Sequence, residues 1–369
     1  MKLVKPYLLA VTAMLTLSCS SQKESLSLKD AYKNDFLIGT ALDVNQIQEK
    51  NSKEDSLIKK EFNAITAENI MKSMYTHPQK GKYDFALSDK FVAYGKKNKM
   101  FIHGHTLIWH SQLAPWMEKI ADSTEMKTFM QDHINTIVSR YKGKIDSWDV
   151  VNEALNEDGT LRKSVFLNTL GEKYLVDAFK LAAKADPNVE LYYNDYNIEE
   201  PAKRAGAIAL IKKIKAEGGK VDGVGIQGHW RLESPSLEEI EKSIVEYSAL
   251  GIKVAFTELD ITVLPNPWDL KGADVNQKFE GNPKMNPYPE KLPDSVQNKL
   301  AERYASIFKL FLKHKDKISR VTFWGVHDKQ SWLNDWPIKG RTNYPLPFDA
   351  DLKHKKAYDS ILNLKESQE

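Results

Sequence analysis

The chain has 369 residues, of which 41% are hydrophobic, 28% charged and 10% aromatic, proportions typical of a globular protein and not of a disordered or collagen-like one. Its 53 Lys and Arg against 50 Asp and Glu give a formal net charge of +3, which is too small to indicate a protein that binds nucleic acid or anionic lipid through charge. We therefore expect a neutral partner and no nucleic acid.

The first 19 residues have the order of a secretory signal. Lys2 and Lys5 precede an apolar run over residues 7–17, and small residues follow around Cys19. The run is too short for a permanent membrane helix. We expect residues 1–19 to be a lipoprotein signal peptide with Cys19 as the lipidated residue. The protein would then be exported, facing the periplasm or cell surface, with this lipid anchor as its one membrane contact; simple secretion is the alternative.

Residues 20–30 are polar and are predicted to be a tether, and residues 31–369 a single domain, because no linker rich in Ser, Pro or Gly divides them. Cys19 is the single cysteine, which excludes an intramolecular disulfide and a thiolate metal cluster. Eight short β-branched and aromatic runs predict strands. They are Phe36–Leu42, Ala64–Ala67, Phe101–Ile108, Ile145–Val151, Glu190–Tyr193, Gly223–Gln227, Lys253–Thr257 and Arg320–Trp324.

Amphipathic segments lie between these runs. Apolar residues recur at helical spacing over residues 175–182 and 208–214, and Pro187 and Gly218 follow as stop signals. Eight alternating strand and helix units in one domain favour a (β/α)₈ TIM barrel, an α/β fold. A doubly wound open sheet is the alternative.

Polar and aromatic residues end almost every predicted strand. Barrel enzymes place their active site at the C-terminal strand ends, so these side chains are expected to converge on one mouth. They are Glu68, Asn69, His105, Trp109, His110, Asn152, Glu153, Asn194, Asp195, Gln227, His229, Glu258, Asp260, Trp324 and His327.

Two of these residues, Glu153 and Glu258, form a candidate catalytic pair. Two glutamates on different strand ends can flank a glycosidic bond, one as proton donor and one as nucleophile. A carboxyl separation of about 5–5.5 Å would give retention of configuration. Trp109, Trp324 and Trp332 lie at or near strand ends, where flat rings can stack on sugar faces.

Seven segments carry a family resemblance, in family order across essentially the whole domain. They are Thr66–Lys72, Gly104–His110, Trp148–Glu153, Tyr193–Asn197, Gly225–His229, Thr257–Asp260 and Trp324–Asp328. With these segments the chain resembles a xylanase of glycoside hydrolase family ten. The resemblance implies a retaining endo-acting enzyme that cleaves β-1,4-xylosidic bonds of xylan or xylo-oligosaccharides through a covalent glycosyl-enzyme intermediate. It needs no cofactor or metal, and we expect a monomer.

The resemblance also implies roles for individual residues. Glu153 matches the acid/base and Glu258 the nucleophile, with His229 and Asp260 supporting Glu258. The residues that match sugar-binding positions are Glu68, Asn69, Lys72, His105, Trp109, Asn152, Tyr196, Gln227, Trp324 and Trp332. Of these, Glu68, Asn69, Lys72 and His105 match positions on the non-reducing side, and Tyr196 matches one on the reducing side. For Glu68 and Lys72 a structural ion pair is the alternative. A pocket walled by Trp324 and Trp332 would admit a pentose and exclude a hexose.

Three alternatives remain open from the sequence. The first is a metal-dependent hydrolase that uses His103, His105 and His110, because alternate residues share one face of a strand. The second is a glycan-binding lipoprotein without activity, and the third is the same machinery acting on cellulose or other glucans. Residues 264–296 form a long proline-containing loop, which is predicted either to shape the product side of the cleft or to be a tolerated surface insertion.

Overall fold

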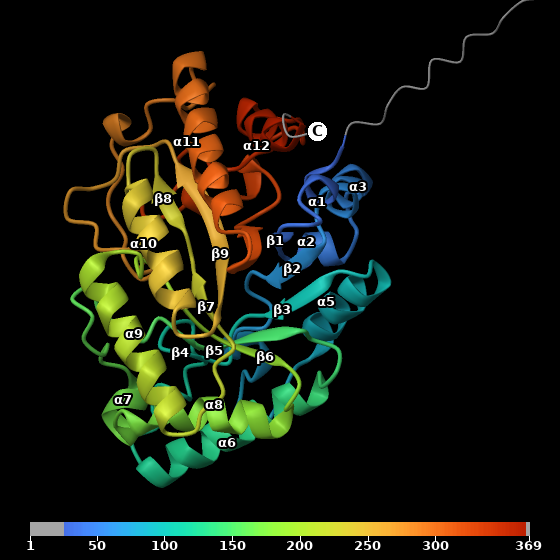
Figure 1. The fold of residues 1–369 in the computed structure, drawn as a ribbon. Helices are drawn as coiled ribbons and strands as arrows, with labels where there is room; N and C mark the ends of the chain where they lie inside the picture. Colours follow the sequence, from blue (N-terminus) through green and yellow to red (C-terminus); the bar gives the residue numbers. More distant parts are fainter. Residues whose placement is uncertain (1–25, 367–369) are drawn as a thin grey trace, which may run out of the picture.

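The strands form a closed, parallel barrel (Figure 1). The computed structural model describes residues 26–366. In this part of the chain the barrel order is β10–β1–β2–β3–β5–β6–β7–β9, and β9 pairs with β10 to close the ring. The prediction of a (β/α)₈ barrel is confirmed, since an open doubly wound sheet would leave two edges unpaired. The barrel strands are β1 (Leu37–Leu42), β2 (Ala64–Ala67), β3 (Phe101–Gly104), β5 (Ser147–Asn152), β6 (Glu190–Asp195), β7 (Gly223–Ile226), β9 (Lys253–Thr262) and β10 (Ile318–Phe323).

Helices connect the strands and cover the outside of the barrel (Figure 1). They are α1 (Leu28–Ala31), α2 (Val44–Ile47), α3 (Ser52–Glu61), α4 (Ser73–Thr76), α5 (Ala86–Lys97), α6 (Ser123–Arg140), α7 (Val165–Leu170), α8 (Lys173–Ala185), α9 (Pro201–Ala216), α10 (Leu237–Ser248), α11 (Asp294–Lys313) and α12 (Lys356–Glu366). Three short 3₁₀ turns are η1 (Pro283–Met285), η2 (Asp328–Gln330) and η3 (Trp332–Asn334). Among residues 26–366, no helix has the length and apolar character needed to cross a membrane.

Local sequence signals explain where several helices begin. The side chain of Asn51 accepts hydrogen bonds from the first backbone N–H groups of α3, and Ser236 does the same for α10, which satisfies donors that a helix start otherwise leaves unpaired. Pro201 occupies the first turn of α9, where a missing N–H costs nothing. Helices α8 and α9 include the two segments that the apolar spacing predicted.

One predicted strand, residues 101–108, is divided in two. Strand β3 ends at Gly104, and the short strand β4 (Ile108–Trp109) pairs separately with β5. Three residues, 105–107, lie opposite two residues of β5, so one extra residue interrupts the ladder. Within this bulge, the Leu107 N–H and the Thr106 hydroxyl both donate to the Asp149 carbonyl. The bulge begins at His105, a predicted site residue.

Another predicted strand, residues 253–257, is longer than expected. Strand β9 continues to Thr262 because a short additional strand, β8 (His229–Arg231), pairs in parallel with its far end. The register sets His229 opposite Asp260. Glu258 therefore lies inside a strand and not at its end, and its backbone is held on both sides.

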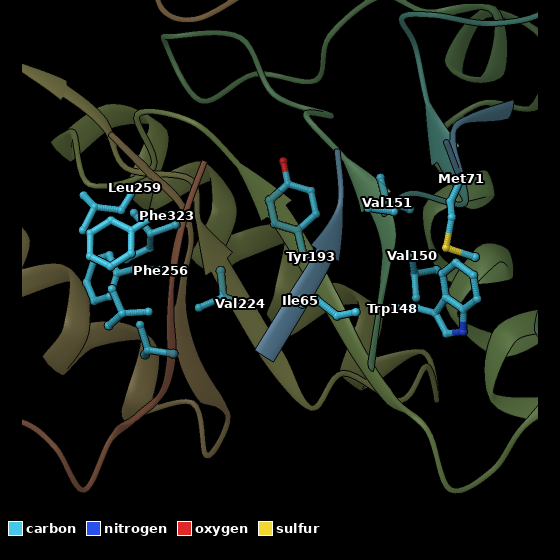
Figure 2. Packing of buried hydrophobic residues seen from close by; sticks show 14 of the residues in the cluster. Ile65, Met71, Trp148, Val150, Val151, Tyr193, Val224, Phe256, Leu259 and Phe323 are labelled. Carbon is cyan, nitrogen blue, oxygen red and sulfur yellow. The ribbon is translucent and has the colours of Figure 1, made fainter. Parts of the chain in front are cut away.

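Neighbouring residues of β5 lie in different surroundings, because successive side chains of a strand point to opposite faces. Trp148 and Val150, two residues apart, lie on the same side of that strand next to Met71 (Figure 2). Asp149, which lies between them in sequence, is fully buried and contacts His103 and His105. Trp148 and Val150 therefore point to one face of the strand and Asp149 to the other, as alternation requires.

The first and last described helices are fixed to each other through one buried carboxylate. Glu61 at the end of α3 accepts hydrogen bonds from the Leu28 N–H at 2.9 Å and the Tyr358 hydroxyl at 3.0 Å. The Tyr32 hydroxyl donates to the Ile361 carbonyl at 2.8 Å. Helices α1 and α12 accordingly lie close together in Figure 1. Their contacts hold the N-terminal and C-terminal ends of the barrel domain next to each other.

Candidate active site

A cavity of about 200 Å³ lies where the barrel strands end. It gathers residues from the ends of six of the eight barrel strands and from the segments that follow them, which is where a (β/α)₈ barrel places its chemistry. The predicted residues that line it are Glu68, Asn69, Lys72, His105, Trp109, Asn152, Glu153, Gln227, His229, Glu258, Trp324 and Trp332. Gln112, Ala273 and Val275 complete the lining, and the sequence analysis did not single them out.

Glu153 follows β5 directly and has an unusual backbone. Its φ is 56°, in the left-handed region that residues other than glycine rarely adopt. The backbone N–H of Glu153 donates to the Asn194 carbonyl at 2.9 Å, which holds this conformation against the neighbouring strand. Strained backbone of this kind costs about 1–3 kcal/mol and is concentrated at functional sites. Here it turns the carboxylate into the cavity.

The Glu153 carboxylate is buried, with 4% exposure, and both of its donors are neutral. The Trp109 indole N–H donates to Oε2 at 2.8 Å and the Gln227 amide donates to Oε1 at 3.0 Å. Burial raises the pKa of Glu153, the two hydrogen bonds lower it, and the nearby charge of Glu258 raises it. The pKa of Glu153 lies above its ordinary value on balance, so this carboxyl group is suited to hold a proton.

The Glu258 carboxylate is equally buried, with 5% exposure, but has a different environment. Asn194 donates to Oε1 at 2.9 Å, and His229 Nε2 lies 3.1 Å from Oε2. Burial alone would raise the pKa of Glu258. The hydrogen bond from His229, the charges of His105 and His229, and the hydrogen bond from Asn194 outweigh burial and lower the pKa below its ordinary value. Glu258 is therefore the carboxylate that stays ionised.

His229 bridges two carboxylates. Its Nδ1 lies 3.0 Å from Asp260 Oδ1 while its Nε2 faces Glu258. Because a carboxylate only accepts, both ring nitrogens must carry hydrogen, and the ring is an imidazolium. Burial lowers the pKa of His229, but the charges and hydrogen bonds of Asp260 and Glu258 raise it to about 10. The Trp332 indole N–H donates to Asp260 Oδ2 at 2.8 Å, which fixes the second carboxylate in turn.

Three side-chain amides connect the two glutamates. The Thr257 hydroxyl donates to Asn194 Oδ1 at 2.6 Å, so the Asn194 amide nitrogen must point toward Glu258. The amides of Asn194 and Asn152 are hydrogen-bonded at 2.9 Å. Gln227 contacts Glu153 directly and has its Nε2 3.4 Å from Asn152 Oδ1. The chain of amides sets the relative position of the carboxylates and offers polar groups to a ligand between them.

One wall of the cavity contains a buried lysine. Lys72 Nζ donates to Asn69 Oδ1 at 2.9 Å and lies 4.9 Å from the centre of a Trp109 ring. Burial lowers the pKa of Lys72, whereas burial and the charge of Asp43 raise the pKa of Glu68 to about 7. The Glu68 carboxylate and the Lys72 ammonium group, both in the part of the chain that the structure describes, do not lie within ion-pair distance of each other. Both side chains line the cavity, where a polar ligand can contact them.

The histidines around β3 do not gather as a metal site would require. His103 and His105 each place one ring nitrogen 2.9 Å from Asp149 Oδ2. Burial would raise the pKa of Asp149, but these two rings hold it well below its ordinary value. The ring of His105 packs edge-on against Trp324, with ring centres 5.6 Å apart. Over residues 26–366, no group of three His, Cys, Asp or Glu side chains has a metal-binding arrangement.

Two predicted site residues lie outside the cavity lining. Asp260 is behind His229, where it acts through that ring. Tyr196, predicted to contact substrate, has 2% exposure. Its hydroxyl accepts a hydrogen bond from Arg162, and Lys203 Nζ lies 3.5 Å from its ring centre. Gly272 packs directly against the ring, so the ring is covered and does not line the cavity in this arrangement.

Two residues for which no role at the site was predicted organise it. Asn194 orients Glu258, and Asp149 positions His105. Both had a visible signal, since Asn194 is one of the polar residues at a predicted strand end and Asp149 is a charged residue inside an apolar strand. Asp149 was missed because a buried carboxylate between hydrophobic neighbours does not show in sequence which side chains it contacts.

A parallel barrel whose mouth holds two buried glutamates in contrasting electrostatic surroundings defines a glycosidase of the barrel type. The chain belongs to glycosyl hydrolase family 10, because the sequence model of that family matches residues 27–364. The match spans essentially all of the described domain.

Individual relatives agree with this assignment. Endo-1,4-beta-xylanase A of Xylanibacter ruminicola is 42% identical over 345 residues, which cover 92% of this chain and 94% of the relative. Beta-1,4-xylanase of Dictyoglomus thermophilum is 37% identical over 363 residues, covering 96% and 97%. Among solved structures, a family 10 endoxylanase from a sugarcane soil metagenome has a TM-score of 0.89 and 46% identity, covering 92% of this chain and all of that one, 100%. Xylanase 10B of Thermotoga petrophila, in complex with xylobiose, has a TM-score of 0.82 and 31% identity, covering 94% and 98%.

Proposed function

We propose that this endo-1,4-β-xylanase cleaves xylan by a retaining double displacement, with Glu258 as the nucleophile and Glu153 as the acid/base. The opposite pKa shifts of these two glutamates in one cavity carry the proposal. The assignment to xylan follows from the family and from relatives that are named as xylanases.

In the first step, Glu258 attacks the anomeric carbon while Glu153 gives its proton to the departing glycosidic oxygen. The imidazolium of His229 keeps Glu258 ionised and aimed, because it donates to Oε2 and leaves Oε1 to Asn194. The neutral donors on Glu153 allow it to keep its proton until the leaving oxygen needs it. The product of this step is a glycosyl-enzyme ester and a shortened chain.

In the second step, Glu153 acts as a base toward water. The ester on Glu258 carries no negative charge, so the repulsion that raises the pKa of Glu153 disappears and its pKa falls. The same carboxylate can then take a proton from water as the water attacks the anomeric carbon. The second inversion restores the original configuration and frees Glu258.

The remaining lining residues are proposed to bind sugar. Asn152 and Gln227, next to the catalytic pair, offer amides to the 2-hydroxyl of the cleaved sugar, whose hydrogen bonds strengthen as positive charge develops on the ring. Glu68, Asn69, Lys72 and His105 would bind hydroxyls on the non-reducing side. Trp109, Trp324 and Trp332 form the walls, and we propose that Trp324 and Trp332 exclude the extra hydroxymethyl group of a hexose. Tyr196 would need to be uncovered before it could take part.

The activity is tested by product release from β-1,4-xylan and from carboxymethyl cellulose, using the chain without residues 1–19. We expect a ladder of short xylo-oligosaccharides, with cellulose intact and Glu258→Ala nearly inactive. Cleavage of cellulose with xylan untouched would preserve the catalytic pair but contradict the pentose pocket. Binding of xylan without cleavage would favour the glycan-binding alternative.

The mechanism has its own test. Proton NMR of the first product released from a xylo-oligosaccharide should show the β-anomer, whereas an α-anomer would require an inverting mechanism. With an aryl β-xylobioside, whose leaving group needs no protonation, Glu153→Ala should accumulate a xylobiosyl ester. Mass spectrometry of peptides should locate that ester on Glu258. Ester on another residue, or none in rapid-quench samples, would contradict the assigned roles.

We further propose an exported lipoprotein with a signal peptide at residues 1–19, a tether that begins at residue 20 and a monomeric catalytic domain. The predicted boundary between tether and domain at residue 30 is too late, because Leu28–Ala31 form helix α1 and Leu28 is fully buried. Cys19 and the signal lie outside the described residues, so this proposal depends on sequence pattern alone. Palmitate labelling in cells should disappear in Cys19→Ser, and light scattering of the chain without residues 1–19 should give the monomer mass. A soluble, unlabelled full-length chain in the culture medium would favour the secreted form.

A further inference from the structure

The long loop between β9 and α11, residues 263–293, follows the C-terminal end of β9, and its residues Ala273 and Val275 line the cavity at the barrel mouth. We call this segment the strap. In the closed strand order, β3 is four strands from β9 in either direction, so the two lie on opposite sides of the ring. The strap begins at β9, and Asn276 within it contacts Ser111, which follows the β3–β4 segment. It therefore spans the full width of the opening.

Two contacts fasten the strap to the far wall. Asp274 Oδ2 lies 3.3 Å from Arg162 Nη1, in the loop after β5, and this ion pair is mostly shielded, with side-chain exposures of 26% and 13%. The Asn276 amide donates to the Ser111 hydroxyl at 3.3 Å. On the near side, the Trp336 indole N–H donates to the Asp274 carbonyl at 3.2 Å. These contacts hold the same short segment of the strap from both walls.

The fastened segment separates two cavities. Ala273 and Val275 line the cavity that contains both glutamates, and Ala273 also lines a second cavity of about 240 Å³. Asn197, Arg231 and Trp336 are on the far side of that partition, together with part of His229 and Asp260. Ala273 of the strap and His229 line both cavities, so the two cavities adjoin at these residues. Each cavity is smaller than the roughly 300–1,000 Å³ of sites that enclose drug-sized ligands.

The strap also rests directly on Tyr196. Gly272 has a φ of 58°, and a Cβ built there would lie 2.3 Å from Cε2 of the Tyr196 ring. A residue with a side chain could not make this approach, since it would be strained in the backbone and would collide with the ring. The strap therefore covers a ring that the family resemblance assigns to sugar contact on the reducing side.

We propose that the strap is a specificity-determining element, held by Asp274 and Asn276, that narrows the product side and makes the enzyme prefer short xylo-oligosaccharides to long xylan. This inference rests on the proposed function. Attack within a polymer requires a cleft that is open on both sides of the cleaved bond. With the strap fastened, the product side accommodates only a short leaving segment. A polymer must bind the form with the strap released, so its apparent affinity is reduced by the fraction of molecules in that form.

The test compares two substrates in each variant, a soluble β-1,4-xylan and an aryl β-xylobioside whose small leaving group needs no open product side. Asp274→Asn with Asn276→Ala removes both far-wall contacts. We expect kcat/KM for xylan to rise about tenfold, since each lost contact shifts the equilibrium by a few-fold. The aryl substrate should change less than twofold. Asp269→Asn, an exposed carboxylate on the same strap, is the matched control and should change neither value.

A second variant tests the same element from the opposite direction. Asp274→Lys sets a cation against Arg162, and like charges at this distance repel, so the ratio of xylan to aryl-xylobioside activity should rise further than in Asp274→Asn alone. An unchanged ratio in both variants, at an unchanged melting temperature, would overturn the proposal. A parallel fall of both activities would also overturn it, because it would mean that the strap supports catalysis and does not limit access.

The experiment distinguishes failure of the strap proposal from failure of the proposed xylanase function. If the parent chain cleaves the aryl β-xylobioside and Glu258→Gln does not, the catalytic assignment holds and the ratio reports on the strap alone. If the parent chain cleaves neither substrate, the proposed function fails and the strap proposal fails with it.

Discussion

Glu153 and Glu258 are the same side chain at the same depth in one cavity, yet their surroundings push their protonation in opposite directions. Exposure is 4% for Glu153 and 5% for Glu258, so burial raises both pKa values in the same sense. The difference comes from the donors. Glu153 is held by the neutral groups of Trp109 and Gln227, while Glu258 is held by an imidazolium. The kind of hydrogen-bond donor, and not depth, assigns the acid and the nucleophile.

The two regions also differ in how the backbone supports them. Glu258 lies inside β9, with β8 paired alongside so that His229 is fixed opposite Asp260. Glu153 lies just past β5 in the left-handed conformation. A nucleophile must approach the anomeric carbon along one line, whereas an acid/base must serve first an oxygen and then a water. The rigid strand suits the first role and the strand terminus suits the second.

Glu258→Gln should have the largest effect. The substitution keeps the shape and the Asn194 contact but removes the attacking oxygen anion, so kcat on xylan and on aryl β-xylobioside should both fall by about 10⁴-fold or more. Steady-state kinetics on both substrates measure this loss, and an unchanged melting curve controls for folding. A variant that kept more than about 1% of its activity on either substrate would remove Glu258 from the nucleophile role.

Glu153→Gln should separate the two substrates. On xylan the leaving oxygen needs a proton, so kcat should fall by about 10²–10⁴-fold, the usual contribution of a general acid. On an aryl β-xylobioside with an acidic phenol the first step should be much less affected, and a burst of phenol should precede a slow steady state. Equal losses on both substrates, with no burst, would mean that Glu153 does not act as the proton donor.

The fold was largely predictable because a (β/α)₈ barrel repeats one local pattern. All eight predicted barrel strands are present, and the segments predicted from apolar spacing became α8 and α9. The errors fall where one strand depends on another. Residues 105–107 look like a strand but form a bulge against β5, and β9 is extended by pairing with β8. Neither pairing can be recognised from the local sequence.

The site was predictable as far as strand ends could locate it. Convergence at one mouth brings together most of the predicted residues because parallel strands end at the same edge. The orientation of Tyr196 was not predictable, since the ring is covered by Gly272, which is 76 residues away along the chain in an irregular loop. The proline residues of that loop predicted irregular structure, but they did not show which wall the loop would contact.

Asp260→Asn should reduce the difference in pKa between Glu153 and Glu258 without abolishing activity. The largest support for the imidazolium of His229 is the charge of Asp260, so the variant should lower the pKa of His229. Glu258 then loses a neighbouring positive charge and its pKa rises. Because Glu258 must be ionised to attack, activity should be lost on acidification at a higher pH than in the parent chain. At neutral pH we expect about a tenfold lower kcat/KM.

The measurement is the pH profile of kcat/KM for an aryl β-xylobioside, which reports the ionisation of the free enzyme. The acid limb, which reports protonation of Glu258, should move to higher pH. The basic limb, which reports loss of the proton from Glu153, should not move. An acid limb that did not move, at reduced activity, would mean that Asp260 only orients the His229 ring. His229→Asn should give the same direction of shift, since it removes the charge itself.

Trp109→Phe should produce the smallest change, and it acts on Glu153, the other glutamate of the pair. The substitution keeps an aromatic wall but deletes the indole N–H that donates to Glu153 Oε2. That hydrogen bond lowers the pKa of Glu153, so its loss should raise the pKa and move the basic limb of the kcat/KM profile to higher pH. The cost in activity should be a few-fold, because one hydrogen bond contributes about 0.5–1.5 kcal/mol.

Trp336→Phe is the matched control, because its indole N–H donates to the Asp274 carbonyl and not to a catalytic carboxylate. It should leave the basic limb in place. A basic limb that moved to lower pH in Trp109→Phe would contradict the reasoning, since it would mean that the indole N–H stabilises the protonated form of Glu153. A shift in both Trp variants would assign the effect to the aromatic wall as a whole. The difference between the two profiles therefore measures how far one neutral donor lowers the pKa of Glu153 toward that of Glu258.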